Sequence, residues 1–233
     1  MNTSANRHPM SPAMKMAELL DTDFSLLGVA TRLGLHFGFG EATVAEVCQK
    51  AGIDPETFLL ICRVYAFDGY RPTREALSAA HLLDILKYLH QSHTYYTDVV
   101  VPEMAAALEQ MIQPCAEKQQ RVIWKFFADY KEELAKHFAY EEGQVFPYVE
   151  AVLNKRSGAQ FTIGEYEENH SNVEEKLEDL KNLVMKYIPA PCNQQEAYKV
   201  LFYIYTLEYD LGKHTFIEDD ILVPMVGRME NHE

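Results

Sequence analysis

The chain of 233 residues is long enough to bury a substantial core, either in one domain or in a small domain beside a larger one. Its composition, 48% hydrophobic and 24% charged, is that of an ordinary water-soluble protein, and no apolar run approaches the roughly 18 to 20 residues of a membrane-spanning helix. A formal net charge of -14 disfavours binding to nucleic acid and to anionic membranes.

The N-terminal stretch MNTSANRHPMSPAMKM lacks the apolar segment of a secretory signal. We therefore expect residues 1–20 to form a flexible tail and the protein to be cytoplasmic. The four cysteines show no paired spacing, so reduced thiols are expected rather than a disulfide framework. These cysteines are Cys48, Cys62, Cys115 and Cys192.

Residues 21–75 are predicted to form a small helical domain. Three short helices are indicated by FSLLGVATRLGL, ATVAEVCQKAG and DPETFLLICRVYAF, separated by glycines and by Asp54-Pro55. The middle segment, ATVAEVCQKAG, could be mistaken for part of a helix-turn-helix motif, but the net negative charge of the chain argues against DNA binding. A joint containing glycine and proline, DGYRPT at residues 68–73, separates this domain from the C-terminal two-thirds of the chain.

Residues 76–233 are predicted to form an antiparallel up-down four-helix bundle, which makes the whole chain all-α. Apolar positions recur at helical spacing in four segments, at about residues 77–111, 116–153, 162–187 and 194–229. The breaks between them are short, and short connections join antiparallel neighbours. Three prolines are expected to kink or end their helices: Pro102, Pro147 and Pro224.

Two segments of this region repeat one pattern, HFAYEEGQVFP at residues 137–147 and HTFIEDDILVP at residues 214–224. Both have His first, Glu fifth, an acid sixth, an apolar residue ninth and Pro eleventh. A His and a Glu four residues apart lie on one helix face, and together they suit iron, manganese or zinc. About one such pair is expected by chance, and His170 with Glu174 is a third, but agreement over the whole pattern favours a metal site.

The other two predicted helices also carry histidines. His93 lies in YLHQSHTYY on the first, and His170 lies in EYEENHSNVEEKL on the third. Facing helices that each donate inward ligands are how metal sites are built in bundle cores. Every helix of the predicted bundle therefore offers at least one candidate ligand.

These motifs resemble the hemerythrin-like (HHE) domain and, more closely, the di-iron proteins that repair iron–sulfur centres. The resemblance covers about residues 78–230. It implies two iron ions held between four helices, with histidines capping the ions and two glutamates bridging them. The ligands that it implies here are His93, His137, Glu141, His170, His214 and Glu218, with His90 as an alternative to His93.

The N-terminal segment LGLHFGFGEATVAEVCQKAGID is similar to the small helical domain that precedes the bundle in the repair proteins. That family often carries two adjacent cysteines where this chain has Phe37 and Gly38. It also usually has a further histidine just after the first helix, near the position of Cys115 here. Three alternatives arise: Cys115 is a thiolate ligand, His90 takes the vacant place, or one iron keeps an open coordination position. We favour the third, and an inert buried thiol is the commonest role of a single cysteine.

The resemblance implies a non-haem di-iron protein that protects or repairs iron–sulfur clusters under oxidative or nitrosative stress, rather than a conventional enzyme. Its partners would be O2, NO or a damaged iron–sulfur protein, and a homodimer is also considered. A reversible O2 or NO carrier or sensor is the main alternative. A di-iron oxidase is suggested only by nearby tyrosines (Tyr95, Tyr96, Tyr140 and Tyr209). A metal-free scaffold is also considered, but it would bury several polar groups at a cost of several kcal/mol.

Three acids are candidates to accept hydrogen bonds from ligand histidines: Glu142, Asp219 and Asp220.

Overall fold

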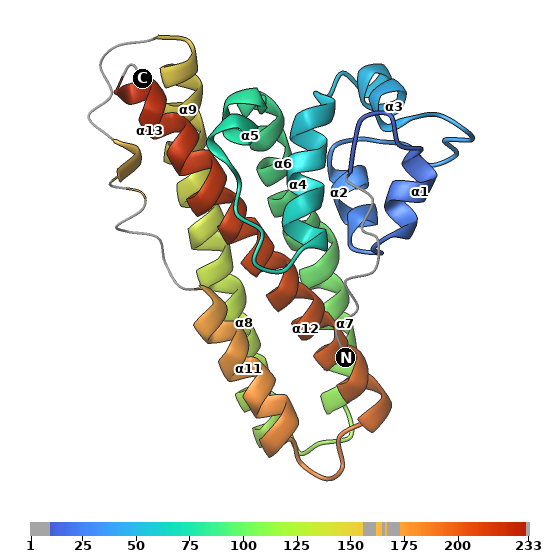
Figure 1. The fold of residues 1–233 in the computed structure, drawn as a ribbon. Helices are drawn as coiled ribbons and strands as arrows, with labels where there is room; N and C mark the ends of the chain where they lie inside the picture. The colour runs from blue at the N-terminus through green and yellow to red at the C-terminus, as the bar shows by residue number, and fades with distance from the viewer. Residues whose placement is uncertain (1–9, 156–161, 165, 167–172, 232–233) are drawn as a thin grey trace. The chain divides into compact units, whose positions relative to one another are not determined.

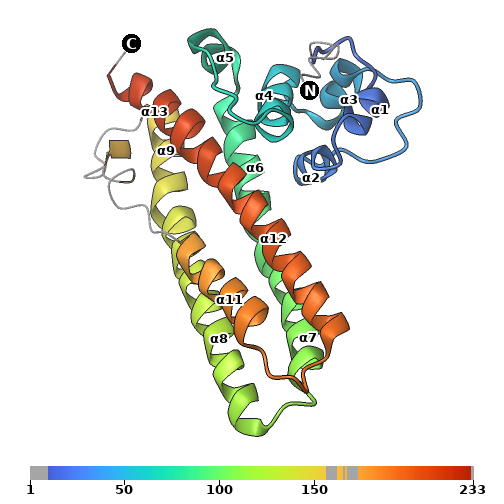
Figure 2. The ribbon, with the colours of Figure 1, turned by 60° about the horizontal axis from the view of Figure 1, so that its bottom comes forward.

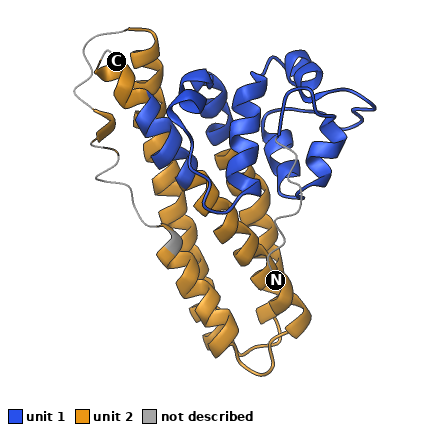
Figure 3. Cartoon of the chain, in the orientation of Figure 1, with its two compact units in different colours: residues 1–91, 216–225 blue, residues 92–215, 226–233 orange. Residues whose placement is uncertain are grey.

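The computed structural model describes residues 10–155, 162–164, 166 and 173–231. Its regular elements are helices, with one isolated bridge between Lys15 and Thr43, and the all-α prediction is confirmed. The chain forms two compact units, one of Met1–Gln91 with Phe216–Met225 and the other of Ser92–Thr215 with Val226–Glu233 (Figure 3). Within the described residues, no helix has the length and apolarity that crossing a membrane requires.

The first unit holds the short helices of the N-terminal region, each with local signals for its ends. These helices are α1 (Met16–Asp21), α2 (Leu26–Arg32), α3 (Val44–Ala51), α4 (Pro55–Ala66), α5 (Arg74–Ala79) and most of α6 (Leu82–Tyr95). Thr43 and Glu46 form a capping box at the start of α3, and Gly52 ends it with a positive φ of 69°. Residues 16–20 are helical, so the predicted tail is too long; Met16 and Leu19 are fully buried and anchor α1.

A buried polar network fixes the start of α6, the helix that carries His93. Arg32 on α2 donates to the Tyr88 hydroxyl at 3.0 Å, and Tyr88 donates to Tyr65 on α4 at 2.7 Å. The backbone N–H of Asp54 also donates to the Asp84 carboxylate at 2.8 Å. Hydrogen-bonded polar groups in a low-dielectric core rigidify it, so these contacts set the position of α6 within the unit.

The second unit contains the body of the bundle, in which four helices lie side by side (Figures 1 and 2). They are α7 (Val101–Ile112), α8 (Glu117–Tyr140), α11 (Val173–Tyr187) and α12 (Gln194–Ile217). One apolar core joins all four, with Leu108, Phe127, Leu180 and Ile204 as one buried contribution from each. The packing follows from the helical periodicity of the sequence, and the bundle prediction is confirmed.

The prolines do not end their helices, and in this respect the prediction is wrong. A π-helical turn precedes each proline-bearing helix: η1 (Tyr96–Val100) before α7, η2 (Glu141–Val145) before α9 (Phe146–Leu153), and η3 (Glu218–Leu222) before α13 (Val223–Glu230). Proline lacks an N–H and crowds the carbonyl four residues earlier, and a wider turn at that point relieves both problems. The helices therefore continue, with Glu141 and Glu218 as the first residues of two of these turns.

A disulfide joins the connections at one end of the bundle. Cys115, in the turn from α7 to α8, pairs with Cys192, in the loop from α11 to α12, with Cα atoms 5.6 Å apart. The expectation of reduced thiols is wrong for this pair, since residues 77 apart in sequence meet only once the helices pack. Cys48 and Cys62 are free and buried, and burial raises the pKa of the Cys62 thiol, which keeps it protonated.

Replacing both Cys115 and Cys192 by Ser is expected to lower the free energy of unfolding by about 4 kcal/mol, because the unfolded chain regains the freedom of the closed loop. Urea unfolding followed by circular dichroism measures the change. A reductant should bring the wild-type protein to the midpoint of the variant and leave the variant unaffected. Equal midpoints for the oxidised and reduced wild type would contradict the cross-link.

Candidate metal centre

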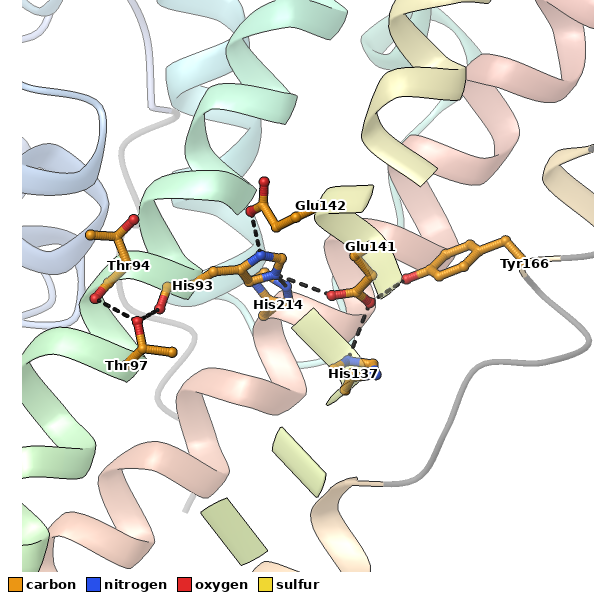
Figure 4. Close-up of polar contacts among 8 residues, drawn as sticks. All are labelled: His93, Thr94, Thr97, His137, Glu141, Glu142, Tyr166 and His214. Atoms are coloured by element: carbon orange, nitrogen blue, oxygen red, sulfur yellow. Dashed lines mark hydrogen bonds and ion pairs between the residues drawn. The ribbon is translucent and has the colours of Figure 1, made fainter. Parts of the chain in front are cut away.

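Four buried residues gather where the repeated motifs of the bundle meet. Their ligand atoms all lie within 4.8 Å of one another: His93 of α6, Glu141 of η2, His214 of α12 and Glu218 of η3. Figure 4 shows His93, Glu141 and His214 directed toward one another. Since His214 and Glu218 are one turn apart on a continuous helix, the same face delivers both.

The spacing of these atoms suits a single ion. Nε2 of His93 lies 3.1 Å from Nε2 of His214 and 3.2 Å from Oε2 of Glu141. Two ligands at right angles, each about 2.1 Å from a metal, would be about 3.0 Å apart. Nitrogen and carboxylate donors together suit iron, manganese or zinc, so the residues fit a transition metal.

The burial of this cluster also favours a cation. Glu141 and Glu218 are both 0% exposed, and His214 is 1% exposed. Two carboxylates removed from water are costly unless positive charge compensates them. A bound metal ion is the most direct compensation that this donor set can accept.

Glu141 faces histidines from two different helices. Its Oε2 is directed at His93, while its Oε1 lies 3.2 Å from Nε2 of His137, one turn earlier on α8. Oε1 also accepts a hydrogen bond from the Tyr166 hydroxyl at 2.9 Å (Figure 4). The two oxygens of one carboxylate thus address two separate imidazoles, an arrangement that can bridge two ions.

The orientation of His93 is fixed from its other side. Nδ1 of His93 lies 2.7 Å from Oε1 of Glu142, and because a carboxylate accepts, the ring nitrogen donates. In the neutral imidazole this leaves the Nε2 lone pair for a cation. The ring also stacks on Phe138 and Phe146, with centroid distances of 4.1 and 5.4 Å.

Glu142 therefore makes the contact expected of it, whereas Asp220 does not. Asp220 forms an ion pair with Arg71 at 2.6 Å within the first unit, so its expected role as a histidine partner is wrong. The guanidinium is a stronger competitor for the carboxylate than a neutral imidazole N–H.

The structure brings together five of the residues that the sequence proposes as ligands: His93, His137, Glu141, His214 and Glu218. His170 lies outside the described residues. His90 is exposed, and the group of closely spaced ligand atoms among the described residues does not include it.

Cys115 is also wrong as a ligand. Its sulfur is bonded to Cys192. Cys115 also lies roughly 30 Å from His93, measured along the helix that carries both α6 and α7. The expected vacant place of a further histidine is thus filled neither by this thiolate nor by His90. No other residue among those described takes part in a metal-ligating group.

The sequence interpretation missed Tyr166, which is 1% exposed and hydrogen-bonded to Glu141. Among the tyrosines that it proposed, only Tyr96 is fully buried, with its ring edge-on to His214 at a centroid distance of 5.8 Å. Tyr95 and Tyr209 are exposed. The available signal was that Tyr166 precedes His170 by four residues, the spacing that places two residues on one helix face.

Comparison with known proteins agrees with this geometry. The hemerythrin HHE cation binding domain matches residues 84–226, a span that includes every member of the cluster, and the chain belongs to this family. The chain is also similar to the iron–sulfur cluster repair protein YtfE of Musicola paradisiaca (strain Ech703). The two are 23% identical over 198 residues, which cover 82% of this chain and 85% of that protein. The chain is thus an HHE protein, and the described residues include a buried His/Glu cluster that could hold a metal ion.

Glu142→Gln is expected to weaken metal binding by about tenfold to hundredfold, because a neutral amide holds the His93 imidazole less firmly than a carboxylate does. Competition with a chromophoric chelator measures the affinity. Glu133→Gln, an exposed change on α8, is the matched control and should leave the affinity unchanged. An unchanged affinity in Glu142→Gln would show that the contact does not support the metal.

Tyr166→Phe is expected to lower the affinity by about tenfold, since Glu141 loses the hydroxyl that orients Oε1 toward His137. The matched control is Tyr130→Phe, which lies in the core of α8 and whose hydroxyl has no hydrogen-bond partner among the described residues. A stepwise titration should show the loss in the first variant and not in the second. Equal losses in both would indicate a packing effect.

Proposed function

We propose that this protein is a non-haem di-iron protein that repairs or protects iron–sulfur clusters during oxidative or nitrosative stress in the cytoplasm. The observation that carries the proposal is the Glu141 carboxylate, whose two oxygens face His93 and His137 on different helices. Such a carboxylate suits two neighbouring ions better than one. The similarity to an iron–sulfur cluster repair protein over most of both chains supports the choice of function.

The proposed ligands are the six residues that the family resemblance implies. Histidines would cap the two ions and two glutamates would bridge them. This set is His93, His137, Glu141, His170, His214 and Glu218. The shared buried position of four of them supports the assignment.

Bound iron would supply redox chemistry and affinity for small diatomic molecules such as NO and O2. The chain itself excludes water from Glu141 and Glu218, both fully buried, and holds the proton on Nδ1 of His93 through Glu142. The family usually has a further histidine ligand, and neither Cys115 nor His90 supplies it here. One iron would therefore keep a position for an exchangeable ligand or would be released more easily. Either property would serve repair of a damaged cluster.

The similarity to the repair protein extends beyond the bundle, which supports a role for the N-terminal region. We propose residues 21–75 as a small helical domain of the kind that precedes the bundle in repair proteins, and residues 76–233 as the di-iron bundle. Phe37 and Gly38 stand where the family often has paired cysteines. Any step that needs those thiols is therefore unavailable to this chain.

The test begins with metal analysis of protein purified without oxygen or added metal. Close to two irons per chain are expected, and the Glu141→Gln, Glu218→Gln double variant should lose them while keeping its helical content. Glu132→Gln, exposed on α8, is the matched control and should retain both ions. A folded wild-type protein that binds no transition metal would sink the proposal.

Function is then tested by adding the iron-loaded protein to an iron–sulfur enzyme inactivated by peroxide or NO. Recovery of that enzyme's activity with the wild type, and not with the double variant, is the expected result. An ultraviolet–visible spectrum in air addresses the alternative, because a carrier shows an oxygen band that disappears when oxygen is removed. A reversible band without recovery of the damaged enzyme would favour the carrier or sensor.

A further inference from the structure

Tyr166 reaches the metal centre from a short helical turn rather than from one of the long helices. Ile163, Gly164 and Tyr166 are helical, and the Tyr166 hydroxyl donates to Oε1 of Glu141 at 2.9 Å (Figure 4). The Tyr166 ring also stacks on Tyr140, with ring centroids 6.4 Å apart. Because so short a helical turn has little stability of its own, contacts with the rest of the unit must set its position.

Glu230, near the end of α13, makes the first of these contacts. One of its carboxylate oxygens, Oε1, accepts a hydrogen bond from the backbone N–H of Ile163 at 3.0 Å. The first N–H groups of a helical turn have no partner within the turn, and a carboxylate is a favourable acceptor for them. The same oxygen accepts a hydrogen bond from the Tyr148 hydroxyl of α9. Glu230 therefore ties the first residue of the turn to both α9 and α13.

The side chain of Ile163 is held by α13 as well. Ile163 is 4% exposed, and a Cβ atom at Gly227 would lie 3.9 Å from its Cγ2, which is van der Waals contact. Gly227 and Glu230 are three residues apart, so one face of α13 provides both the packing surface and the hydrogen-bond acceptor. Ile163 and Tyr166 are also three residues apart and share one side of the turn. Fixing Ile163 therefore fixes the direction of Tyr166.

We propose that Glu230 is a positioning residue of the metal centre, which holds the turn at Ile163 and thereby places the Tyr166 hydroxyl on Glu141. Oε1 of Glu141 also lies 3.2 Å from Nε2 of His137, so the hydroxyl orients an oxygen that faces a proposed ligand. Glu230 is not in the group of closely spaced ligand atoms, and it acts through the turn. This role rests on the proposed metal site and adds to it a residue outside the repeated motifs.

The first test uses the metal-free protein and the NMR signals of the Tyr166 ring, identified by their absence in Tyr166→Phe. Glu230→Ala should shift these signals toward those of an exposed tyrosine, because the N–H of Ile163 loses its acceptor. Glu230→Gln keeps a carbonyl oxygen as acceptor and should retain the wild-type signals. Glu150→Ala, an exposed change on α9, is the matched control and should also retain them. Unchanged Tyr166 signals in Glu230→Ala overturn the proposal.

The second test is a double-mutant cycle on metal affinity, measured by competition with a chelator. Glu230→Ala should lower the affinity by about tenfold, as Tyr166→Phe does, and Glu230→Gln should restore it. The two changes remove the same contact, so the double variant should lose no more than Tyr166→Phe alone. A loss equal to the product of the two single losses would show independent effects and overturn the proposal.

The two tests separate this inference from the function proposed above. A folded wild-type protein that binds no transition metal contradicts that function. The ring signals of Tyr166 in the metal-free protein then decide alone whether Glu230 places the hydroxyl on Glu141. Metal binding by the wild type together with independent losses in the cycle retains the function and rejects the role of Glu230.

Discussion

The burial of two carboxylates in the core of a helical bundle is the constraint on which the rest of this structure depends. Glu141 and Glu218 have no solvent exposure, and Glu141 receives polar contacts from two imidazoles and from the Tyr166 hydroxyl. The positions of three histidines within 3.2 Å of one another or of Glu141 are explained by that requirement. A bound cation would satisfy the carboxylates and the imidazole lone pairs together, which agrees with the match to an HHE cation binding domain.

The prolines place these carboxylates. Each of the two glutamates begins a π-helical turn that leads into a proline-bearing helix, so a constraint on the backbone sets the direction of a ligand. A π-helical turn also precedes Pro102, but there the turn begins at Tyr96 instead of a glutamate. His93 lies nine residues before this proline, one position later than the histidine of the repeated motif. The bundle thus contains three copies of one backbone feature, of which two deliver carboxylates and one delivers a buried tyrosine beside His214.

The sequence alone was sufficient to predict the helices and most of the His/Glu cluster, because both follow from local periodicity. A histidine and a glutamate four residues apart must share a helix face, and an apolar stripe must turn that face inward. The contacts that were missed are those that periodicity does not determine. The disulfide joins residues 77 apart, and the hydrogen bond from Tyr166 joins two segments that only the folded chain brings together. The π turns were missed because the prolines were expected to kink or end their helices, whereas a local change of hydrogen-bond pattern lets each helix continue.

The bundle is held by different chemistry at its two ends, and this division bears on how a metal could be exchanged. At one end, the Cys115–Cys192 bond and the backbone contact from Asn193 to Met111 fix the connections between helices. A mainly apolar core, including Phe127, extends from there toward the site. At the site itself, the helices meet through ionisable side chains, and a bound cation would add to their attraction. Removal of such an ion would weaken contacts at that end, while the covalent and apolar end would persist. A metal-binding bundle divided in this way can release an ion without unfolding as a whole.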